Sequence, residues 1–130
     1  GVRFVIHCIE QMEGGEVFVP KIPSMKVIDL ASAIAPQAKV DIIGIRPGEK
    51  LHEVLISEDE ARNTIELKDM FVVQPAEATW FGYQWQGKGK QIQDDFRYSS
   101  DNNTEWLDLE GIKKYIAPFE ELYKAGKLEG

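Results

Sequence analysis

A proline–glycine pair at positions 47 and 48 constrains the fold of this chain more than any other feature. The apolar run Val40–Ile45 precedes the pair and predicts a buried strand. Pro47 fixes its own φ and Gly48 can take a positive φ, so the chain can reverse direction at once. A helix is then predicted to begin at Glu49, because the helix dipole favours an anion in the first turn.

The predicted bend would hold Arg46 and Glu49 three residues apart. A guanidinium is a forked donor that suits a phosphate, and a carboxylate accepts hydrogen bonds from hydroxyl groups. The two side chains together therefore indicate a site for a ligand that carries both a phosphate and hydroxyls. The alternative is a surface ion pair across a turn, which is common and weak in proteins.

The composition excludes several classes of partner. A chain of 130 residues is enough for one domain, and its net charge of −7 argues against nucleic acid as a partner. No apolar run reaches the roughly 20 residues of a membrane span, and no signal peptide is present. Cys8 is the only cysteine, which fits a reducing cytoplasm. The chain starts with Gly1, inside an apparent helix, which favours a fragment or a trimmed chain.

Hydrophobic spacing predicts a small α/β unit with at least partly parallel strand pairing. Apolar residues at three- and four-residue steps predict helices, and short β-branched runs predict strands. Pro118 is expected to kink or split the last helix. The predicted helices cover residues 2–12, 27–34, 49–55 and 112–123, and the predicted strands cover residues 16–19, 40–45, 64–67 and 70–73.

Three further polar positions have both a functional and an ordinary interpretation. Lys21, in a rigid proline-bounded loop, is either a second phosphate contact or a solvated lysine. His7 and Cys8 suggest a nucleophile, but adjacent helical residues point apart, so a surface histidine and a buried cysteine are expected. The acidic stretch 57–60 lacks the pattern of a Ca²⁺ loop and predicts a helix cap. Two distant histidines do not make a metal site.

Aromatic residues alternate with polar ones at Phe81, Tyr83 and Trp85, which predicts a strand with one apolar face. That face could stack on sugar rings, form a protein interface or close over the domain's own core. No glycine fingerprint for a dinucleotide follows any predicted strand. Hence no cofactor is expected to be held by this chain alone.

Several longer motifs, taken in order, resemble one family. They are Gly14–Met25, Ile43–Glu53, Leu55–Ala61, Val72–Pro75 and Tyr98–Asn103. Together they are similar to the C-terminal part of the inverting UDP-N-acetylglucosamine 4,6-dehydratases, which are extended short-chain dehydrogenases/reductases and include capsule and flagellin-glycan enzymes. The similarity runs from about residue 1 to residue 109.

The resemblance implies roles for four residues. In that superfamily the Arg of the Arg-Pro-Gly-acid motif contacts the UDP diphosphate and the acidic residue holds the ribose. Carried over, Arg46 would bind phosphate oxygens and Glu49 the ribose hydroxyls. Lys21 and Met25 would lie on a loop near the same cleft. The implied fold is a small C-terminal substrate-binding subdomain of the α/β type, without the Rossmann domain, with residues 1–109 binding a UDP-sugar and residues 110–130 forming a C-terminal helix and tail.

The resemblance also limits the expected activity. In that family NADP accepts and returns a hydride, and the catalytic residues lie in the N-terminal half, which has no counterpart here. We therefore expect a UDP-sugar-binding portion that is inactive in isolation and cytoplasmic. The alternative is a free-standing oligomerisation or interaction module, in which an exposed apolar face with Phe81, Tyr83 and Trp85 as contacts would make a homo-oligomer.

Overall fold

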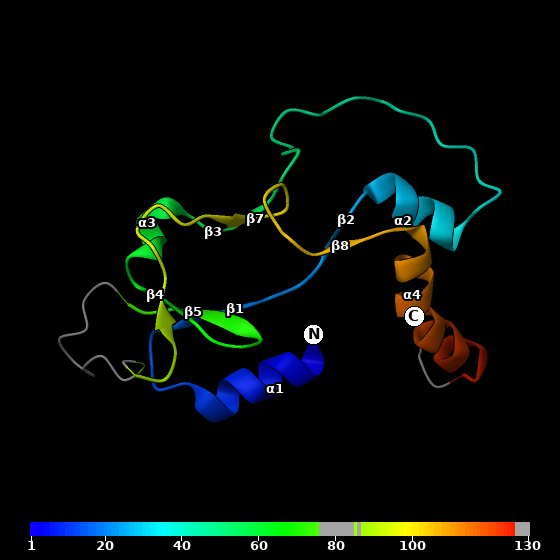
Figure 1. The fold of residues 1–130 in the computed structure, drawn as a ribbon. Coiled ribbons are helices and arrows are strands. Elements are labelled where there is room, and N and C mark those ends of the chain that lie inside the picture. Colours follow the sequence, from blue (N-terminus) through cyan, green and yellow to red (C-terminus); the bar gives the residue numbers. More distant parts are fainter. Residues whose placement is uncertain (76–84, 86, 127–130) are drawn as a thin grey trace. The chain divides into compact units, whose positions relative to one another are not determined.

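The structure, a computed structural model, describes residues 1–75, 85 and 87–126 (Figure 1). The chain forms two compact units, and each is built from two separated pieces of sequence. The sheet unit consists of Gly1–Ile22 and His52–Asn102. The helix unit consists of Pro23–Leu51 and Asn103–Gly130.

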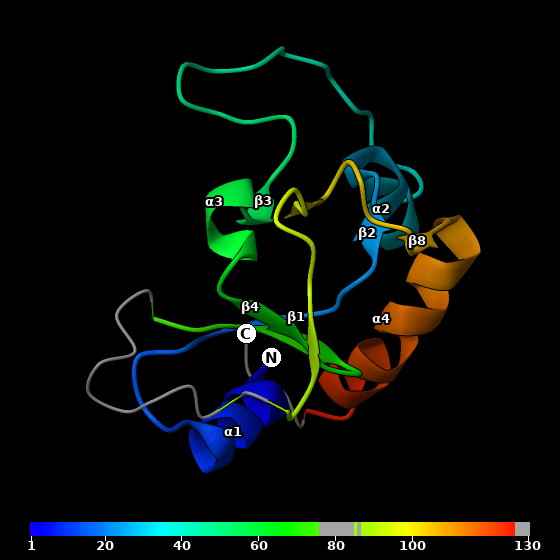
Figure 2. The same cartoon turned by 60° about the vertical axis from the view of Figure 1, so that its left-hand side comes forward.

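A four-stranded antiparallel sheet is the centre of the sheet unit, with strand order β1-β5-β4-β6. The hairpin predicted from the sequence is confirmed as β4 and β5, and the first strand as β1. Both views show α1 running beside this sheet (Figures 1 and 2). The bounds are α1 Val2–Gln11, β1 Val17–Pro20, β4 Thr64–Glu66, β5 Met70–Val73 and β6 Lys90–Gln91.

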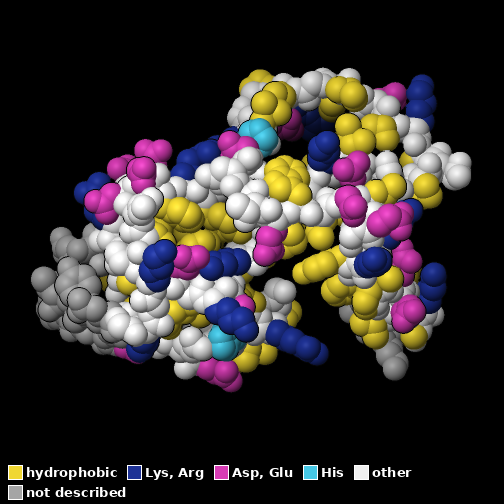
Figure 3. Space-filling view, in the orientation of Figure 1, with side chains coloured by type: hydrophobic (Ala, Val, Ile, Leu, Met, Phe, Trp, Pro, Cys, Tyr) yellow, Lys and Arg dark blue, Asp and Glu magenta, His cyan; other side chains and the backbone are white. Residues whose placement is uncertain are grey.

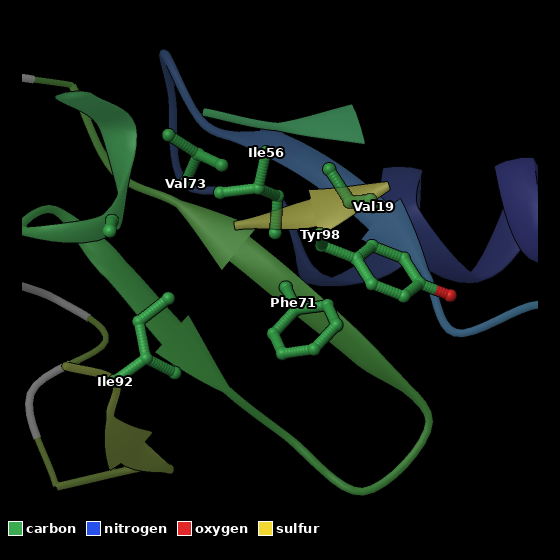
Figure 4. Close-up of a cluster of buried hydrophobic side chains, with 7 residues drawn as sticks. Val19, Ile56, Phe71, Val73, Ile92 and Tyr98 are labelled. Carbon is green, nitrogen blue, oxygen red and sulfur yellow. The ribbon is translucent and has the colours of Figure 1, made fainter. Parts of the chain in front are cut away.

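Both faces of β5 are buried, which explains its uninterrupted apolar sequence. Side chains alternate along a strand, so Met70 and Val72 pack with Ile65 on one face, where Phe4 of α1 also packs. Phe71 and Val73 pack into the larger cluster on the opposite face, together with Val19, Ile56, Ala61, Ile92 and Tyr98 (Figure 4). The Tyr98 hydroxyl points out of this cluster (Figure 4) and both donates to the carbonyl and accepts from the N–H of Ile22, each at 3.0 Å.

A second, two-stranded antiparallel pair joins β3 (Val54–Ile56) to β7 (Tyr98–Ser99). The short helix α3 (Glu58–Ala61) follows β3 and begins with the cap that the acidic stretch predicted. Glu60 accepts hydrogen bonds from the Ser57 backbone at 2.9 Å and from the Ser57 hydroxyl at 2.6 Å, which completes a capping box. These bonds outweigh the effect of burial and lower the pKa of the Glu60 carboxyl.

Trp85 is buried, so it does not belong to the exposed interface that the sequence left open as one alternative. Its indole N–H donates to Glu16 at 3.0 Å, and its ring meets Phe18 edge-on at 5.6 Å between centroids. The ring therefore closes over the sheet unit's own core, one of the alternatives left open by the sequence. Phe81 and Tyr83 lie outside the described residues.

The helix unit is built on one parallel strand pair and one helix pair. Strand β2 (Ser24–Met25) pairs in parallel with β8 (Trp106–Leu107), and α2 (Val27–Ile34) packs against α4 (Leu109–Lys124). Asp108 caps α4 by accepting from the Gly111 N–H at 2.7 Å. The helix continues through Pro118 and is not split. Proline removes only one helical donor, which the packing on α2 can offset.

Hydrophobic side chains remain at the surface of both units. Figure 3 shows them along the connection between α2 and β3 and along α4. They include five residues at α1, namely Val2, Val5, Ile6, Ile9 and Met12. Among the described helices, none combines the length and the apolar character required to cross a bilayer.

Candidate functional site

The bend at residues 46–49 forms as the sequence predicts. The Glu49 N–H donates to the Arg46 carbonyl at 3.0 Å, and Gly48 has a φ of +89°. Proline followed by a glycine at positive φ is the signature of a type II turn. The Glu49 carboxylate closes the same turn by accepting from the Arg46 backbone N–H at 2.8 Å.

The two charged side chains of the bend lie close together in solvent. Arg46 Nε is 4.0 Å from Glu49 Oε1, and the side chains are 71% and 52% exposed. An ion pair this long and this exposed contributes little to stability. The terminal guanidinium nitrogens have no partner among the described residues, so they are available to a ligand.

The elements predicted on either side of the bend are wrong. Residues 40–45 form no strand and pair with no described strand, and Ile42 is 85% exposed. No helix follows the bend either, because Val54–Ile56 pairs as β3 with Tyr98–Ser99 instead. An apolar run becomes a strand only where a partner satisfies its backbone groups, and none of the described residues does so for 40–45.

The segment after the bend is fixed where it enters the sheet unit. The Ser100 N–H donates to the Glu53 carbonyl at 2.9 Å, and the Glu53 N–H donates to the Ser100 hydroxyl at 3.1 Å. His52 Nδ1 lies 3.4 Å from the same hydroxyl. The sequence alone did not identify Ser100 as this anchor, because the contact joins residues nearly fifty positions apart.

Lys21 is already engaged within the sheet unit. Its ammonium lies 2.8 Å from Glu66 Oε1 and 4.9 Å from the centre of the Phe71 ring. Its backbone N–H donates to the Asp69 carbonyl at 3.0 Å. The side chain is 28% exposed, so Lys21 is not the solvated lysine considered from the sequence, and as a phosphate contact it stays a prediction.

Met25 is half-buried in β2, opposite Leu107 in the helix unit. Arg46 and Glu49 belong to the same unit, whereas Lys21 belongs to the sheet unit. Of the four residues that the resemblance singles out, the structure brings together Arg46 and Glu49.

The Cys8 thiol has the environment of a structural cysteine. It is half-buried on α1, and burial raises its pKa, which keeps the thiol protonated and weakly reactive. The exposed His7 side chain instead contacts Gln11, at 2.9 Å. The expected surface histidine is confirmed, and Cys8 is less buried than expected.

Neither a metal nor a dinucleotide has a suitable site in the described residues. No group of three or more His, Cys, Asp or Glu side chains is placed to bind a metal ion within the ranges 1–75, 85 and 87–126. The described strand-to-helix junctions are Lys26, Ser57 and Asp108, whereas a dinucleotide fingerprint needs glycines at such a junction. None of these three described junctions therefore carries the glycines of a dinucleotide fingerprint.

Comparison with known proteins gives the fold a context. The chain is 46% identical over 112 residues to the UDP-N-acetylglucosamine 4,6-dehydratase (inverting) of Campylobacter jejuni subsp. jejuni serotype O:23/36 (strain 81-176), covering 82% of this chain and 34% of that protein. It is 47% identical over 122 residues to the protein of the same description from strain ATCC 700819 / NCTC 11168, covering 89% and 36%. The X-ray structure of Pen from Bacillus thuringiensis matches with a TM-score of 0.72 and 27% identity, covering 91% of this chain and 36% of that one.

These matches confirm the class of fold expected from the sequence, a small α/β C-terminal subdomain of the extended short-chain dehydrogenase/reductase type. The family described as polysaccharide biosynthesis protein matches residues 1–75, and the chain belongs to that family. The chain spans about a third of the length of the curated relatives it matches.

Proposed function

We propose that this chain binds the nucleotide part of a UDP-sugar, within a protein that acts as a UDP-N-acetylglucosamine 4,6-dehydratase. The observation that carries the proposal is the 46–49 bend, in which one carboxylate and one backbone bond fix the backbone from which the Arg46 guanidinium extends into solvent. The description of the Campylobacter relatives supports the class of substrate.

The bend offers two complementary groups to such a ligand. The terminal nitrogens of Arg46 can donate two parallel hydrogen bonds to diphosphate oxygens. Glu49 uses Oε2 for the Arg46 backbone, and Oε1 makes only the long contact of 4.0 Å, so Oε1 can accept from a ribose hydroxyl. Because the turn is closed without a ligand, its backbone needs no further ordering on binding, and the remaining ordering cost is that of the Arg46 side chain.

Lys21 and Met25 are further contacts that we propose for the same substrate. Lys21 would have to exchange Glu66 for a phosphate oxygen, whereas Met25 would supply an apolar surface. Two further statements stay predictions from the sequence. One is that residues 1–109 bind the UDP-sugar and residues 110–130 form a helix and tail, and the other is the cytoplasmic location.

The direct test is a calorimetric titration of the whole chain with UDP. We expect Arg46→Ala to weaken binding by about 1.5–3 kcal/mol, because a charge-assisted contact is lost. Arg46→Lys should recover only part of the loss, since an ammonium cannot make the bidentate contact.

Arg62→Ala is the matched control for this titration. Arg62 is also exposed and also lies about one turn from an acidic partner, with Nη2 3.7 Å from Asp59 Oδ1. The Arg62→Ala variant should bind UDP with the same affinity as the unchanged protein. Equal UDP affinities for Arg46→Ala and Arg62→Ala would show that the 46–49 bend is not part of the UDP-binding site.

We infer that the contribution of this chain is binding and orientation, and that it has no dehydratase activity alone. Incubation with NADP and UDP-N-acetylglucosamine should give no 4-keto sugar, while the full-length Campylobacter relative serves as the positive control. Product formed by the isolated chain would contradict this inference.

A second candidate function is that of an oligomerisation module. The observation that favours it is the apolar surface at α1. Trp85, one of the three aromatic contacts considered from the sequence, is buried in the core. A homo-oligomer formed in this way would not depend on UDP, so sedimentation with and without UDP separates the two functions.

A further inference from the structure

The Glu49 carboxylate is held in place by the turn that it closes. Its Oε2 accepts from the Arg46 backbone N–H at 2.8 Å, and the Glu49 backbone N–H donates to the Arg46 carbonyl at 3.0 Å. The side chain and the backbone of Glu49 are therefore both bonded to Arg46, and the carboxylate cannot turn away without breaking a hydrogen bond of the turn. An acceptor fixed in this way is preorganised for a ligand.

Most of the hydrogen-bonding capacity of this carboxylate is unused. An ionised carboxylate has about four lone-pair positions and no donor. Within the part of the chain that the structure describes, the Arg46 N–H fills one of these positions, on Oε2. Oε1 has only the 4.0 Å contact with Arg46 Nε, which is too long for a hydrogen bond. The carboxylate can therefore accept from two further donors, one on each oxygen.

The same contact gives the bend a direction. Arg46 approaches the carboxylate through Nε, so its two terminal nitrogens form the other edge of the guanidinium. A phosphate is attracted by those nitrogens and repelled by the Glu49 carboxylate, and it therefore binds at the edge away from Glu49. The groups of the ligand that lie beside Glu49 must then be uncharged donors, and in a nucleotide these are the ribose hydroxyls.

We propose that Glu49 selects nucleotides that have both ribose hydroxyls, and that it discriminates against 2′-deoxy and 3′-deoxy nucleotides. The two neighbouring hydroxyls lie on one face of the ribose ring and can donate to the two oxygens of a single carboxylate. This inference rests on the proposed UDP site and divides the work within it. Arg46 supplies affinity for the diphosphate, and Glu49 restricts the ligand class to ribonucleoside diphosphates.

The size of the discrimination follows from the exposure of the site. An analogue without one hydroxyl leaves one carboxylate oxygen without its donor, which is very costly in a closed site because the oxygen stays unpaired. Glu49 is about half exposed, so water can replace part of the lost hydrogen bond. We expect each deoxy analogue to bind about tenfold more weakly than UDP, which corresponds to one hydrogen bond to a charged group at the weak end of its range.

Calorimetric titration of the whole chain with UDP, 2′-deoxy-UDP and 3′-deoxy-UDP tests the proposal. The three ligands have the same base and the same diphosphate, so the ratio of their dissociation constants reports on the ribose alone. For the unchanged protein, each ratio to UDP should be about ten. Glu49→Ala should bring both ratios to within about twofold of one, because the acceptor is lost while Pro47 and Gly48 still favour the turn.

Two control variants separate recognition of the ribose from a general effect on the bend. Arg46→Ala should weaken the binding of all three ligands by the same factor and leave the ratios at about ten. Asp59→Asn removes a carboxylate that also lies beside an arginine, at 3.7 Å from Arg62 Nη2, and should change neither the affinities nor the ratios.

The outcomes distinguish this proposal from the proposed function. If Glu49 only stabilised the turn, Glu49→Ala would weaken all three ligands equally and keep the ratios at about ten. That result would overturn the proposal, and so would equal dissociation constants of UDP and either deoxy analogue for the unchanged protein. In both cases the UDP site itself would stand. A chain that does not bind UDP would overturn the proposed function as well.

Discussion

Arg46 and Lys21 carry the same charge but have very different surroundings. The Arg46 guanidinium extends into solvent from a turn, while the Lys21 ammonium contacts a carboxylate and an aromatic ring. A ligand phosphate can bind Arg46 without breaking a strong contact. At Lys21 it would first have to compete with Glu66.

Replacing Glu66 tests whether Lys21 contacts the substrate. Glu66→Gln removes the partner charge, so the free energy of unfolding should fall by about 0.5–1 kcal/mol. If Lys21 binds phosphate, UDP affinity should rise at the same time, because the Lys21 charge is no longer neutralised. Chemical denaturation and calorimetry measure the two effects.

Asp69→Asn is the control for this substitution. It removes the same charge from the loop between β4 and β5, where the backbone carbonyl of Asp69, not its side chain, contacts Lys21. It should leave both quantities nearly unchanged. An unchanged or lower UDP affinity for Glu66→Gln would exclude Lys21 from the binding site.

The local sequence was sufficient to predict the geometry of the 46–49 bend but not the contacts of Lys21. Arg46, Pro47, Gly48 and Glu49 are consecutive, so turn chemistry alone predicts their geometry. The partner of Lys21 lies 45 residues away and depends on the pairing of β1, β5 and β4. Residue spacing carries no information about such a contact.

Elements with their own local signals were predicted well. The helices α1 and α2, the strand β1 and the β4–β5 hairpin all lie within a few residues of their predicted positions. The cap at Ser57 was also predicted, because Glu60 follows at the spacing of a capping box. In each case the signal is contained in fewer than a dozen adjacent residues.

Elements that depend on a distant partner were predicted poorly. Residues 40–45 have the composition of a strand but no described neighbour to pair with, and Val54–Ile56 became a strand because Tyr98–Ser99 pairs with it. Short apolar segments are ambiguous between helix and strand, and the tertiary partner decides. Trp85 illustrates the same limit for burial, since Glu16 and Phe18 determine its place.

At the scale of the whole molecule, acid should destabilise the sheet unit. Burial raises the pKa of Glu16, but hydrogen bonds from Trp85, Gly14 and Glu13 outweigh it and lower the pKa. The pKa of Asp101 is lowered to about 2, chiefly by the hydrogen bond from the Ser99 hydroxyl and further by Arg97. Together with Glu60, these carboxyls belong to the sheet unit.

A lowered pKa in the folded state means that the unfolded state takes up protons first as the pH falls. The stabilisation is therefore complete above the ordinary carboxyl values of 4.5 for Glu16 and Glu60 and 3.8 for Asp101, and it is lost below them. We expect the melting temperature to fall steadily from about pH 5 towards pH 2.

Asp101→Asn provides the control for this titration. It retains an oxygen that can accept from Ser99 but cannot titrate, so its melting temperature should fall less than that of the unchanged protein between pH 4 and pH 2. Thermal denaturation monitored by circular dichroism measures the melting temperatures of the variant and of the unchanged protein. A melting temperature that is constant or rises on acidification would contradict the assignment.

The interleaving of the two units has a consequence for synthesis. Strand β2 pairs with β8, which the ribosome adds about 80 residues later, a delay of roughly 4 to 16 seconds at 5 to 20 residues per second. Strand β1 likewise waits for β5, which begins at Met70. Throughout that interval the nascent chain exposes apolar segments whose pairing partners have not yet been synthesised. We therefore expect it to bind chaperones that hold nascent chains.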